Sequence, residues 1–358
     1  MFGKNLKIVL CTRLNGGEIM KKILFYISGI YNGGTEIALY NLISHMDSNK
    51  YKIYINYTDH SEIFLPLASK ILKYSEYVEL DKDIQVDILI YCNNANEKID
   101  KIRKNIRYSK AYFWFHYFGD GQEEFVRELI ENNEIDKVIT VCETIKKILL
   151  DWECFKNKQD KVISISNILD AEGIRNKSKE VVKMKLSNNL NLITVARFSI
   201  TKGYHRVKAL IDSINSKNIE FKLFIIGNGN TQEDENRVRN MFKEYKKNVE
   251  FLGYQENPYK FVRQCDYNVL LSDRENMSLA LLEAKILGVP SIVTDFESAY
   301  EQIEDMHNGI ILSRENLDTY RDRVDDIVNN IEKFKENSKN FIYDTEKIKK
   351  QWNELLSK

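Results

Sequence analysis

The residues most suited to chemistry surround the start of an expected helix and include two glutamates, Glu275 and Glu283. An apolar strand ends before Ser272, and Ser278 can cap the next helix by accepting a backbone hydrogen bond. The helix N-terminus then offers unpaired amides to an anion. Glu283 lies in the second turn, from which it can reach the same pocket. A carboxylate among apolar residues needs hydrogen-bond donors, such as sugar or ribose hydroxyls. The alternative is an acid that only interacts with the helix dipole, and this would explain Glu275 but not Glu283 as well.

Two cations follow another apolar strand. Arg197 and Lys202 come directly after the strand expected over residues 192–196, at the carboxyl end where ligands of parallel α/β sheets bind. Arg can bind two phosphate oxygens and Lys adds a point charge, so the pair suits a diphosphate and a departing nucleotide. A pair of surface cations at a turn is an equally good interpretation of these two residues alone.

Glycine-rich turns follow two further strands. Gly29, Gly33 and Gly34 separate the first strand from the first helix, and Gly227 follows the strand at 222–226. Glycine lets the backbone approach a ligand closely. The spacing is not GxGxxG, and no acidic residue follows at the distance that nicotinamide binding requires. Each turn taken singly is an ordinary connection between a strand and a helix.

Short apolar strands alternate with amphipathic helices around these residues. The alternation predicts parallel sheets with helices on both faces. Strands are expected at 23–28, 51–57, 87–91, 111–116, 137–141, 192–196, 222–226, 249–252, 267–271 and 291–293, and helices at 35–46, 143–150, 203–214, 233–245, 278–287 and within 317–356. The charged span 170–190 contains no expected strand and was interpreted as a linker leading into the next domain. The pattern therefore indicates two successive doubly wound α/β domains.

Composition limits the function. The 358 residues are 43% hydrophobic, enough for about two domains. The 53 Lys+Arg balance 53 Asp+Glu, which argues against a nucleic-acid partner because phosphate neutralisation needs clustered cations. Five scattered cysteines without a CxxC pair favour neither disulfides nor zinc. No apolar run is long enough to span a membrane, so we expect a cytoplasmic protein.

The segment 272–290 resembles the Glu-x7-Glu motif of retaining glycosyltransferases of the family 4 group (glycosyl transferases group 1). That family has the GT-B fold, in which two Rossmann-like doubly wound domains face an inter-domain cleft. Further matches occur in the family's order, and together they make the resemblance specific. They are Gly33, Gly34 and Glu36 in the first loop, His116 after an aromatic strand, Asn167 and Asp170 between the domains, Arg197 and Lys202, the turn 251–253, and Glu301 with Asn308 and Gly309.

The resemblance implies roles for the matched residues. Glu283 would bind ribose hydroxyls of the donor nucleotide, Glu275 would bind donor-sugar hydroxyls, and His116 would approach that sugar from the other domain. The expected catalytic residues are Glu275, His116, Arg197 and Lys202. The two cations and nearby backbone amides would hold the donor diphosphate. The expected donor-binding residues are Gly33, Gly34, Arg197, Lys202, Gly227, Gly253, Tyr254, Glu275, Asn276, Met277, Ser278, Leu279 and Glu283.

One residue departs from the family pattern. Asn276 stands where the family usually has glycine. Asn tolerates a positive φ better than most residues, so the turn can form, but its side chain would narrow the sugar pocket and bear on the choice of donor.

The implied activity is transfer of a sugar from a nucleotide diphosphate sugar to a hydroxyl of a glycan or lipid-linked acceptor. A UDP-sugar is favoured over a GDP-sugar, with retained anomeric configuration by front-side attack, in cell-surface polysaccharide or glycoconjugate synthesis. Two alternatives stay open. One is a catalytically degenerate GT-B partner of another glycosyltransferase, and the other is a GT-B sugar-nucleotide epimerase.

Two charged segments raise the question of a metal and of a membrane. Asp81-Lys82-Asp83 spells DxD but is typical of a solvated loop, so we expect no essential divalent metal and no cofactor.

The basic stretch could dock on anionic lipid at the inner face of the cell membrane, or form a solvated helix face with similar probability. It comprises Lys98, Lys101, Arg103, Lys104, Arg107 and Lys110.

The expected domain limits follow from these patterns. Residues 1–19 are expected to be an upstream or non-native extension without function, because Met20 directly precedes the first clear strand. Residues 20–172 form the expected acceptor-binding domain, and 173–338 the expected nucleotide-sugar-binding domain. Residues 339–358 are expected to form a helix that returns to the first domain.

Overall fold

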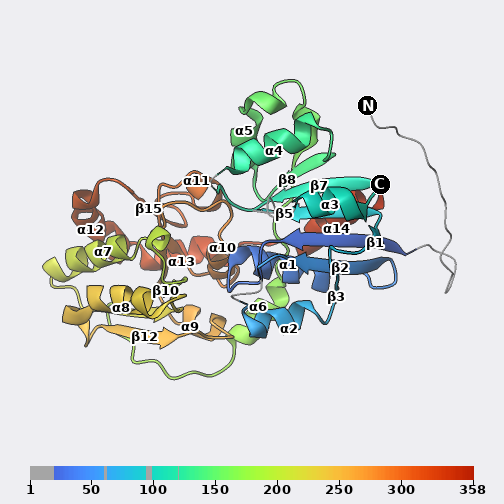
Figure 1. Ribbon diagram of the computed structural model, residues 1–358. Helices are drawn as coiled ribbons and strands as arrows, with labels where there is room; N and C mark the ends of the chain where they lie inside the picture. The colour runs from blue at the N-terminus through green and yellow to red at the C-terminus, as the bar shows by residue number, and fades with distance from the viewer. Residues whose placement is uncertain (1–19, 60–62, 94–98, 120) are drawn as a thin grey trace.

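The computed structural model describes residues 20–59, 63–93, 99–119 and 121–358. The expected extension 1–19 and Lys98 of the basic stretch lie outside these ranges. Two α/β domains, each with its own parallel sheet, make up the described chain (Figure 1). The predicted fold class, α/β with two doubly wound domains, is confirmed.

The first sheet has seven parallel strands in the order β3-β2-β1-β5-β7-β8-β9. Helices cover both faces, so the strands are continuous apolar runs rather than alternating ones; in β1 the five residues from Ile23 to Ile27 are buried. The strands are β1 Lys21–Ile27, β2 Tyr51–Tyr57, β3 Glu76–Tyr77, β5 Ile88–Cys92, β7 Lys110–Phe115, β8 Lys137–Thr140 and β9 Val162–Ser164, and β4 Ile84–Gln85 pairs separately with β6 Ile106–Arg107. The helices are α1 Gly34–Ser44, α2 Leu65–Ile71, α3 Ile99–Asn105, α4 Gln122–Glu131 and α5 Glu143–Leu150.

The second sheet has six parallel strands in the order β12-β11-β10-β13-β14-β15. The chain order reverses beside β10, which creates the switch point where such sheets bind ligands. The strands are β10 Leu190–Val195, β11 Phe221–Ile226, β12 Val249–Gly253, β13 Tyr267–Leu270, β14 Ser291–Thr294 and β15 Gly309–Leu312. The helices from the linker onward are α6 Ala171–Ser178, α7 Tyr204–Ser216, α8 Gln232–Met241, α9 Tyr259–Val262, α10 Leu279–Ile286, α11 Ala299–Gln302, α12 Tyr320–Asn329 and α13 Ile331–Lys339.

The structure contains elements that the sequence did not predict, among them the ten-residue helix α4 and several shorter helices and strands. The span interpreted as a linker contains helix α6, which Asp170 caps by accepting a hydrogen bond from the Gly173 amide at 2.8 Å. Strands β9 and β15 were not predicted, because three or four residues are too few to show a hydrophobic period.

A last helix, α14 (Thr345–Ser357), lies against the first sheet although it follows the second in sequence (Figure 1). Its Trp352 packs edge-on against Trp114 of β7, with ring centroids 4.9 Å apart. Lys21 at the start of β1 donates a hydrogen bond to the Leu356 carbonyl at 3.0 Å. The helix therefore supplies part of the first domain's core.

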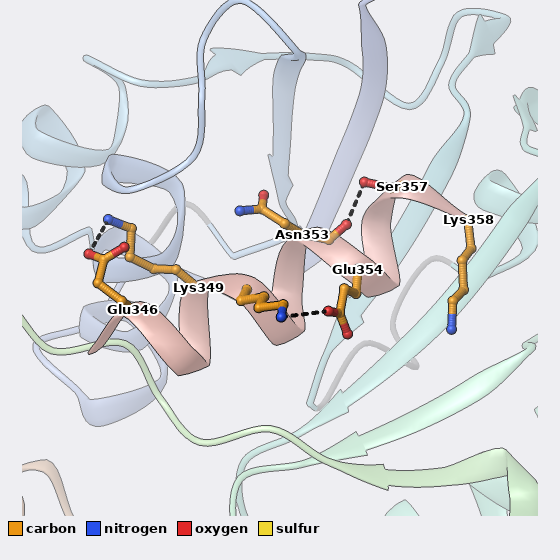
Figure 2. Close-up of a pocket in the computed structure, with 7 residues that line it drawn as sticks. Glu346, Lys349, Asn353, Glu354, Ser357 and Lys358 are labelled. Carbon is orange, nitrogen blue, oxygen red and sulfur yellow. Dashed lines mark hydrogen bonds and ion pairs between the residues drawn. The ribbon is translucent and has the colours of Figure 1, made fainter. Parts of the chain in front are cut away.

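The outer face of α14 carries a surface hollow of about 540 Å³. Figure 2 shows that the labelled side chains around it all come from this one helix. Lys349 pairs there with Glu346 at 2.8 Å, and Lys350 with Glu354 at 3.9 Å. These are ordinary pairs between successive helical turns, so the hollow has the character of a solvated helix face.

Candidate functional site

Two adjoining cavities lie between the carboxyl edges of the two sheets. One, of about 340 Å³, is lined by Gly34, Arg197, Lys202, Gly227, Tyr254, Glu275, Met277, Ser278, Leu279 and Glu283, among others. The other, of about 780 Å³, is lined by His116 and Asn276 and shares Arg197, Lys202 and Glu275 with the first. The structure thus brings together every predicted site residue except Gly33 and Gly253, which do not line either cavity.

The two predicted cations have different surroundings. The Lys202 ammonium lies 2.6 Å from the Glu275 carboxylate, and the side chains are 23% and 12% exposed. By contrast, no residue of the described chain forms a hydrogen bond or ion pair with the Arg197 guanidinium. Arg197 can therefore accept a phosphate without first breaking an ion pair, whereas Lys202 and Glu275 act as a unit.

Two glycines set the backbone at this site. A Cβ at Gly203 would lie 1.8 Å from the Leu271 carbonyl oxygen, and this close approach brings Lys202 beside the Glu275 loop. Gly227, with φ +142°, passes the Ala196 carbonyl so closely that a Cβ would lie 2.0 Å from its oxygen. Gly227 is thus required by packing between β10 and β11 as well as by its place in the cavity wall. Gly253 contributes indirectly, because its carbonyl accepts the Gly227 amide at 3.0 Å.

Glu283 of α10 faces the smaller cavity. The Tyr259 hydroxyl donates to its carboxylate at 3.0 Å. Burial raises the pKa of Glu283 to about 7, although Tyr259 and the charge of Lys177 act in the opposite direction. A carboxylate held in this way gains stability from additional hydroxyl donors, because they favour its charged form. Tyr259 and Lys177 were not predicted, since neither belongs to a local motif.

The loop before α10 is held from several directions. Ser278 is the N-cap, as expected, and its hydroxyl accepts from the Leu281 amide at 3.4 Å. Asn276 is buried, does not adopt a positive φ, and its side-chain nitrogen has no partner in the described part of the protein. The turn therefore forms at Asn276 without the positive φ that asparagine would tolerate. Its unpartnered amide supplies a donor at the wall of the larger cavity.

His116 follows β7 and packs at a tilt against Trp114, with ring centroids 4.2 Å apart. Burial lowers the pKa of His116 to about 3, so the ring is neutral near pH 7. Its Nε2 has no partner among residues that the structure describes. The turn is fixed by Asn93, whose side-chain oxygen accepts from the His116 and Tyr117 amides at 2.5 and 3.2 Å. Asn93 was not predicted, although it directly follows β5 at the same sheet edge.

A third hollow, of about 520 Å³, lies on the first domain's side and also reaches Arg197. Its wall includes the carboxylates of Glu36 and Asp59 together with Asn93 and Tyr117. Glu36 is only 8% exposed. Burial raises its pKa to about 7, and the Arg197 charge partly counteracts this shift. This wall offers acceptors and donors suited to hydroxyl groups.

The structure pairs two of the five described members of the basic stretch, Lys101 and Arg103, with acids. Lys101 lies 2.6 Å from Asp81, the first residue of the DxD segment. Arg103 binds Glu128 and Glu134 at 2.5 and 2.9 Å. The described members therefore present less unpaired positive charge to an anionic surface than the sequence suggested.

Within residues 20–59, 63–93, 99–119 and 121–358, no group of three His, Cys, Asp or Glu side chains could hold a metal ion. No helix in these ranges has the length and apolar character needed to cross a bilayer.

Comparison with known proteins identifies the family of the second domain. The family model described as "Glycosyl transferases group 1" matches residues 176–347. The chain is 23% identical over 197 residues to the capsular polysaccharide biosynthesis glycosyltransferase CapM of Staphylococcus aureus, covering 54% of this chain and 52% of CapM. It is 25% identical over 209 residues to the O-antigen biosynthesis glycosyltransferase WbnH of Escherichia coli, covering 58% of this chain and 60% of WbnH. The matches thus span little more than half the length of either relative.

A solved structure extends the likeness to nearly the whole chain. HepE of Anabaena in complex with UDP-glucose superimposes with a TM-score of 0.75 at 16% identity, covering 94% of this chain and 99% of HepE. At this identity the likeness concerns the fold, and it includes both sheets and the order of the domains. Residues 176–347 of this protein therefore belong to the glycosyl transferases group 1 family, within a chain that has the GT-B fold.

Proposed function

We propose that this protein is a retaining glycosyltransferase that moves a sugar from a nucleotide diphosphate sugar to a hydroxyl of a glycan or lipid-linked acceptor. A UDP-sugar is the favoured donor and a GDP-sugar the next candidate. Cell-surface polysaccharide or glycoconjugate synthesis is the proposed setting, in line with the names of CapM and WbnH. HepE, which shares the fold, binds UDP-glucose.

One observation carries the proposal: the inter-domain cavity combines an unpaired cation with a half-buried carboxylate. Arg197 would bind the diphosphate, and the first amides of α10 at Leu279 and Ala280, which have no acceptor within the helix, would bind it from the other side. Glu283 would accept hydrogen bonds from the ribose. These groups suit the diphosphate and the ribose of a nucleotide. The positive charge lies where negative charge develops on the diphosphate as its bond to the sugar breaks.

The larger cavity suits the transferred sugar. Glu275, held by Lys202 at 2.6 Å, would accept hydrogen bonds from donor-sugar hydroxyls, and the neutral His116 ring would approach from the first domain. In front-side attack the leaving phosphate oxygen takes the acceptor proton, so no protein carboxylate is needed behind the sugar carbon. The third hollow, with Glu36 and Asp59 in its wall, would receive the acceptor.

A binding screen tests the proposal. Thermal unfolding of the full chain would be followed with UDP, GDP, ADP and their common sugar conjugates, and sugar transfer would be measured with the base that shifts the midpoint. A ligand at 100 times its dissociation constant stabilises the native state by about 2.7 kcal/mol, which shifts the midpoint visibly. A shift with one base supports the donor site. No shift with any nucleotide would favour a degenerate GT-B partner, and donor conversion without transfer would favour an epimerase.

Turnover is expected to need no divalent metal. Arg197 and the α10 N-terminus supply the positive charge at the proposed diphosphate site, so EDTA should leave the rate unchanged. The rates with EDTA and with added manganese would be compared. Loss of turnover with EDTA, restored by manganese, would contradict this expectation.

Replacing Gly34 by valine should weaken donor binding without unfolding the protein. A Cβ at Gly34 meets no atom within 4 Å, so the fold has room for it, but this space belongs to both cavities. The valine methyls would occupy the path of the diphosphate, and we expect the nucleotide dissociation constant to rise at least about tenfold. Calorimetric titration measures the change, with Gly34→Ala as the smaller control. An unchanged dissociation constant in Gly34→Val would mean that the donor does not approach this turn.

A further inference from the structure

A short turn in the second domain contacts both the other domain and the loop that carries Glu275. Helix α11 (Ala299–Gln302) projects Glu301 towards α5 of the first domain. One carboxylate oxygen accepts from the Glu143 amide at 3.0 Å, and the other from the Thr144 amide at 2.7 Å. A single side chain therefore caps a helix that belongs to the opposite domain.

Helix α5 depends on this contact for its capping. Its own N-cap residue, Cys142, makes no side-chain hydrogen bond to the helix, so the Glu143 and Thr144 amides would otherwise have no hydrogen-bond acceptor among the described residues. A carboxylate at this position also interacts favourably with the helix dipole. Partial burial opposes ionisation of Glu301, yet hydrogen bonds from Thr144 and Glu143 outweigh it, and its pKa lies below the usual value. The contact is thus made by a charged carboxylate.

The residues on either side of Glu301 hold the donor loop. The Ser298 hydroxyl donates to the Glu275 carbonyl at 2.9 Å. The Gln302 side-chain oxygen accepts from the Ser278 amide at 3.2 Å, and its nitrogen donates to Ser298 at 3.0 Å. Ser298 and Gln302 are 0% and 4% exposed. This turn therefore fixes both the backbone of Glu275 and the start of α10.

A second contact joins the same two segments. The Cys142 thiol donates to the Asn276 carbonyl at 3.2 Å, so the residue before α5 touches the loop directly. The N-terminus of α5, the α11 turn and the loop from Glu275 to Ser278 form one continuous set of hydrogen bonds across the cleft. Moving the first domain away would release Glu301 and the Asn276 carbonyl together.

We propose that Glu301 is a positioning residue that couples docking of the first domain to the arrangement of the Glu275 loop. With α5 docked, Glu301 holds α11, and α11 holds the loop through Ser298 and Gln302. With the domains apart, the loop loses this support and the donor sugar loses its fixed neighbours. The transfer geometry is then complete only in the closed cleft, from which water is excluded. This inference rests on the proposed glycosyltransferase function.

The test compares the parent with Glu301→Gln and with a matched control, Glu304→Gln. Glu304 is exposed and follows α11 by two positions, and its side chain makes no hydrogen bond or ion pair with the described residues. The glutamine at 301 keeps the size of the side chain but removes the charge and one of the two acceptors. Four quantities are measured on the full chain: kcat, KM for the donor, the thermal midpoint, and the radius of gyration from small-angle X-ray scattering without ligand.

Glu301→Gln is expected to lower kcat about five- to tenfold, at the lower end of typical coupling between sites. KM should stay within about twofold, because Arg197 and Glu283 are untouched, and the midpoint should stay within about 2 °C. The radius of gyration should increase, as the undocked arrangement gains population. The control should match the parent in all four quantities.

Two results would overturn the inference: a kcat equal to that of the control, or a loss of kcat accompanied by a fall of many degrees in the midpoint, which indicates a merely structural role. If the parent transfers sugar from no donor, the proposed function fails separately. The scattering comparison then still decides the matter, since an unchanged radius of gyration in Glu301→Gln means that Glu301 does not hold the domains together.

Discussion

Arg197→Ala is expected to lower kcat/KM for the donor about 10³-fold, the effect typical of removing one preorganised group that stabilises developing negative charge. Arg197 lines all three hollows, and its guanidinium makes no hydrogen bond or ion pair with any described residue. The charge of Arg197 is therefore not paired with any acid of the described chain. The thermal midpoint of the ligand-free variant should stay close to that of the parent, for the same reason.

The comparison needs two controls. Arg197→Lys keeps the charge but not the paired donors, and its loss should be smaller than that of alanine. Arg263→Ala removes an exposed arginine next to α9 and should change nothing. Steady-state rates over a range of donor concentrations measure the effect. If Arg197→Ala retained kcat/KM within threefold of the parent, the diphosphate could not be bound at this strand end.

Glu283→Gln should have opposite effects on binding and on stability. Hydrogen bonds to a charged group contribute about 1.5–3 kcal/mol, so loss of the charge should raise the nucleotide dissociation constant by about 10- to 100-fold. The ligand-free variant should nevertheless be more stable than the parent at pH 8. A neutral amide at this position avoids holding a charge in a poorly solvated site.

The pH dependence follows from the raised pKa. The folded protein keeps the Glu283 proton up to a pKa of about 7, whereas the unfolded chain loses it near the ordinary glutamate pKa of 4.5. Between these values the folded state binds more protons, so stability falls as pH rises through the window and stays lower above it. Glutamine does not titrate. The stability difference between Glu283→Gln and the parent should be near zero below pH 4.5 and about 3 kcal/mol at pH 8.

Thermal midpoints from pH 4 to 8, with and without nucleotide, measure both effects. Glu250→Gln on β12 is a matched control, because Glu250 is exposed and its replacement should affect neither. If the thermal midpoints of the parent and of Glu283→Gln changed with pH in parallel, Glu283 would not be held in its protonated form. Equal nucleotide affinities would remove Glu283 from the donor site.

Most of the strands and their order of appearance could be predicted because burial on both faces produces unbroken apolar runs. Residues such as Ile23 to Ile27 and Phe224 to Ile226 admit few other interpretations. Candidate site residues at strand ends, such as Arg197, could be predicted because parallel strands place their carboxyl ends at one sheet edge. Ser278 as a helix cap follows from local chemistry alone.

Contacts between the domains could not be predicted, because they join residues that share no local pattern. Glu301 is more than 150 positions from the amides that it caps, and nothing near it in sequence marks the partner. Within the second domain, the pairs Tyr259–Glu283 and Lys202–Glu275 likewise join residues that share no local pattern. The basic stretch suggested a lipid surface because its acidic partners Glu128 and Glu134 lie in a later segment.

The position of α14 has a consequence for protein synthesis. The ribosome makes every strand of the first sheet before it makes any residue of the second domain, yet the sheet face around Trp114 receives Trp352 only after that domain has been translated. During this interval an apolar face of the nascent chain lacks its cover and is open to chaperones or to aggregation. The rate at which α7 to α13 are translated therefore sets how long the first half of the nascent protein needs protection.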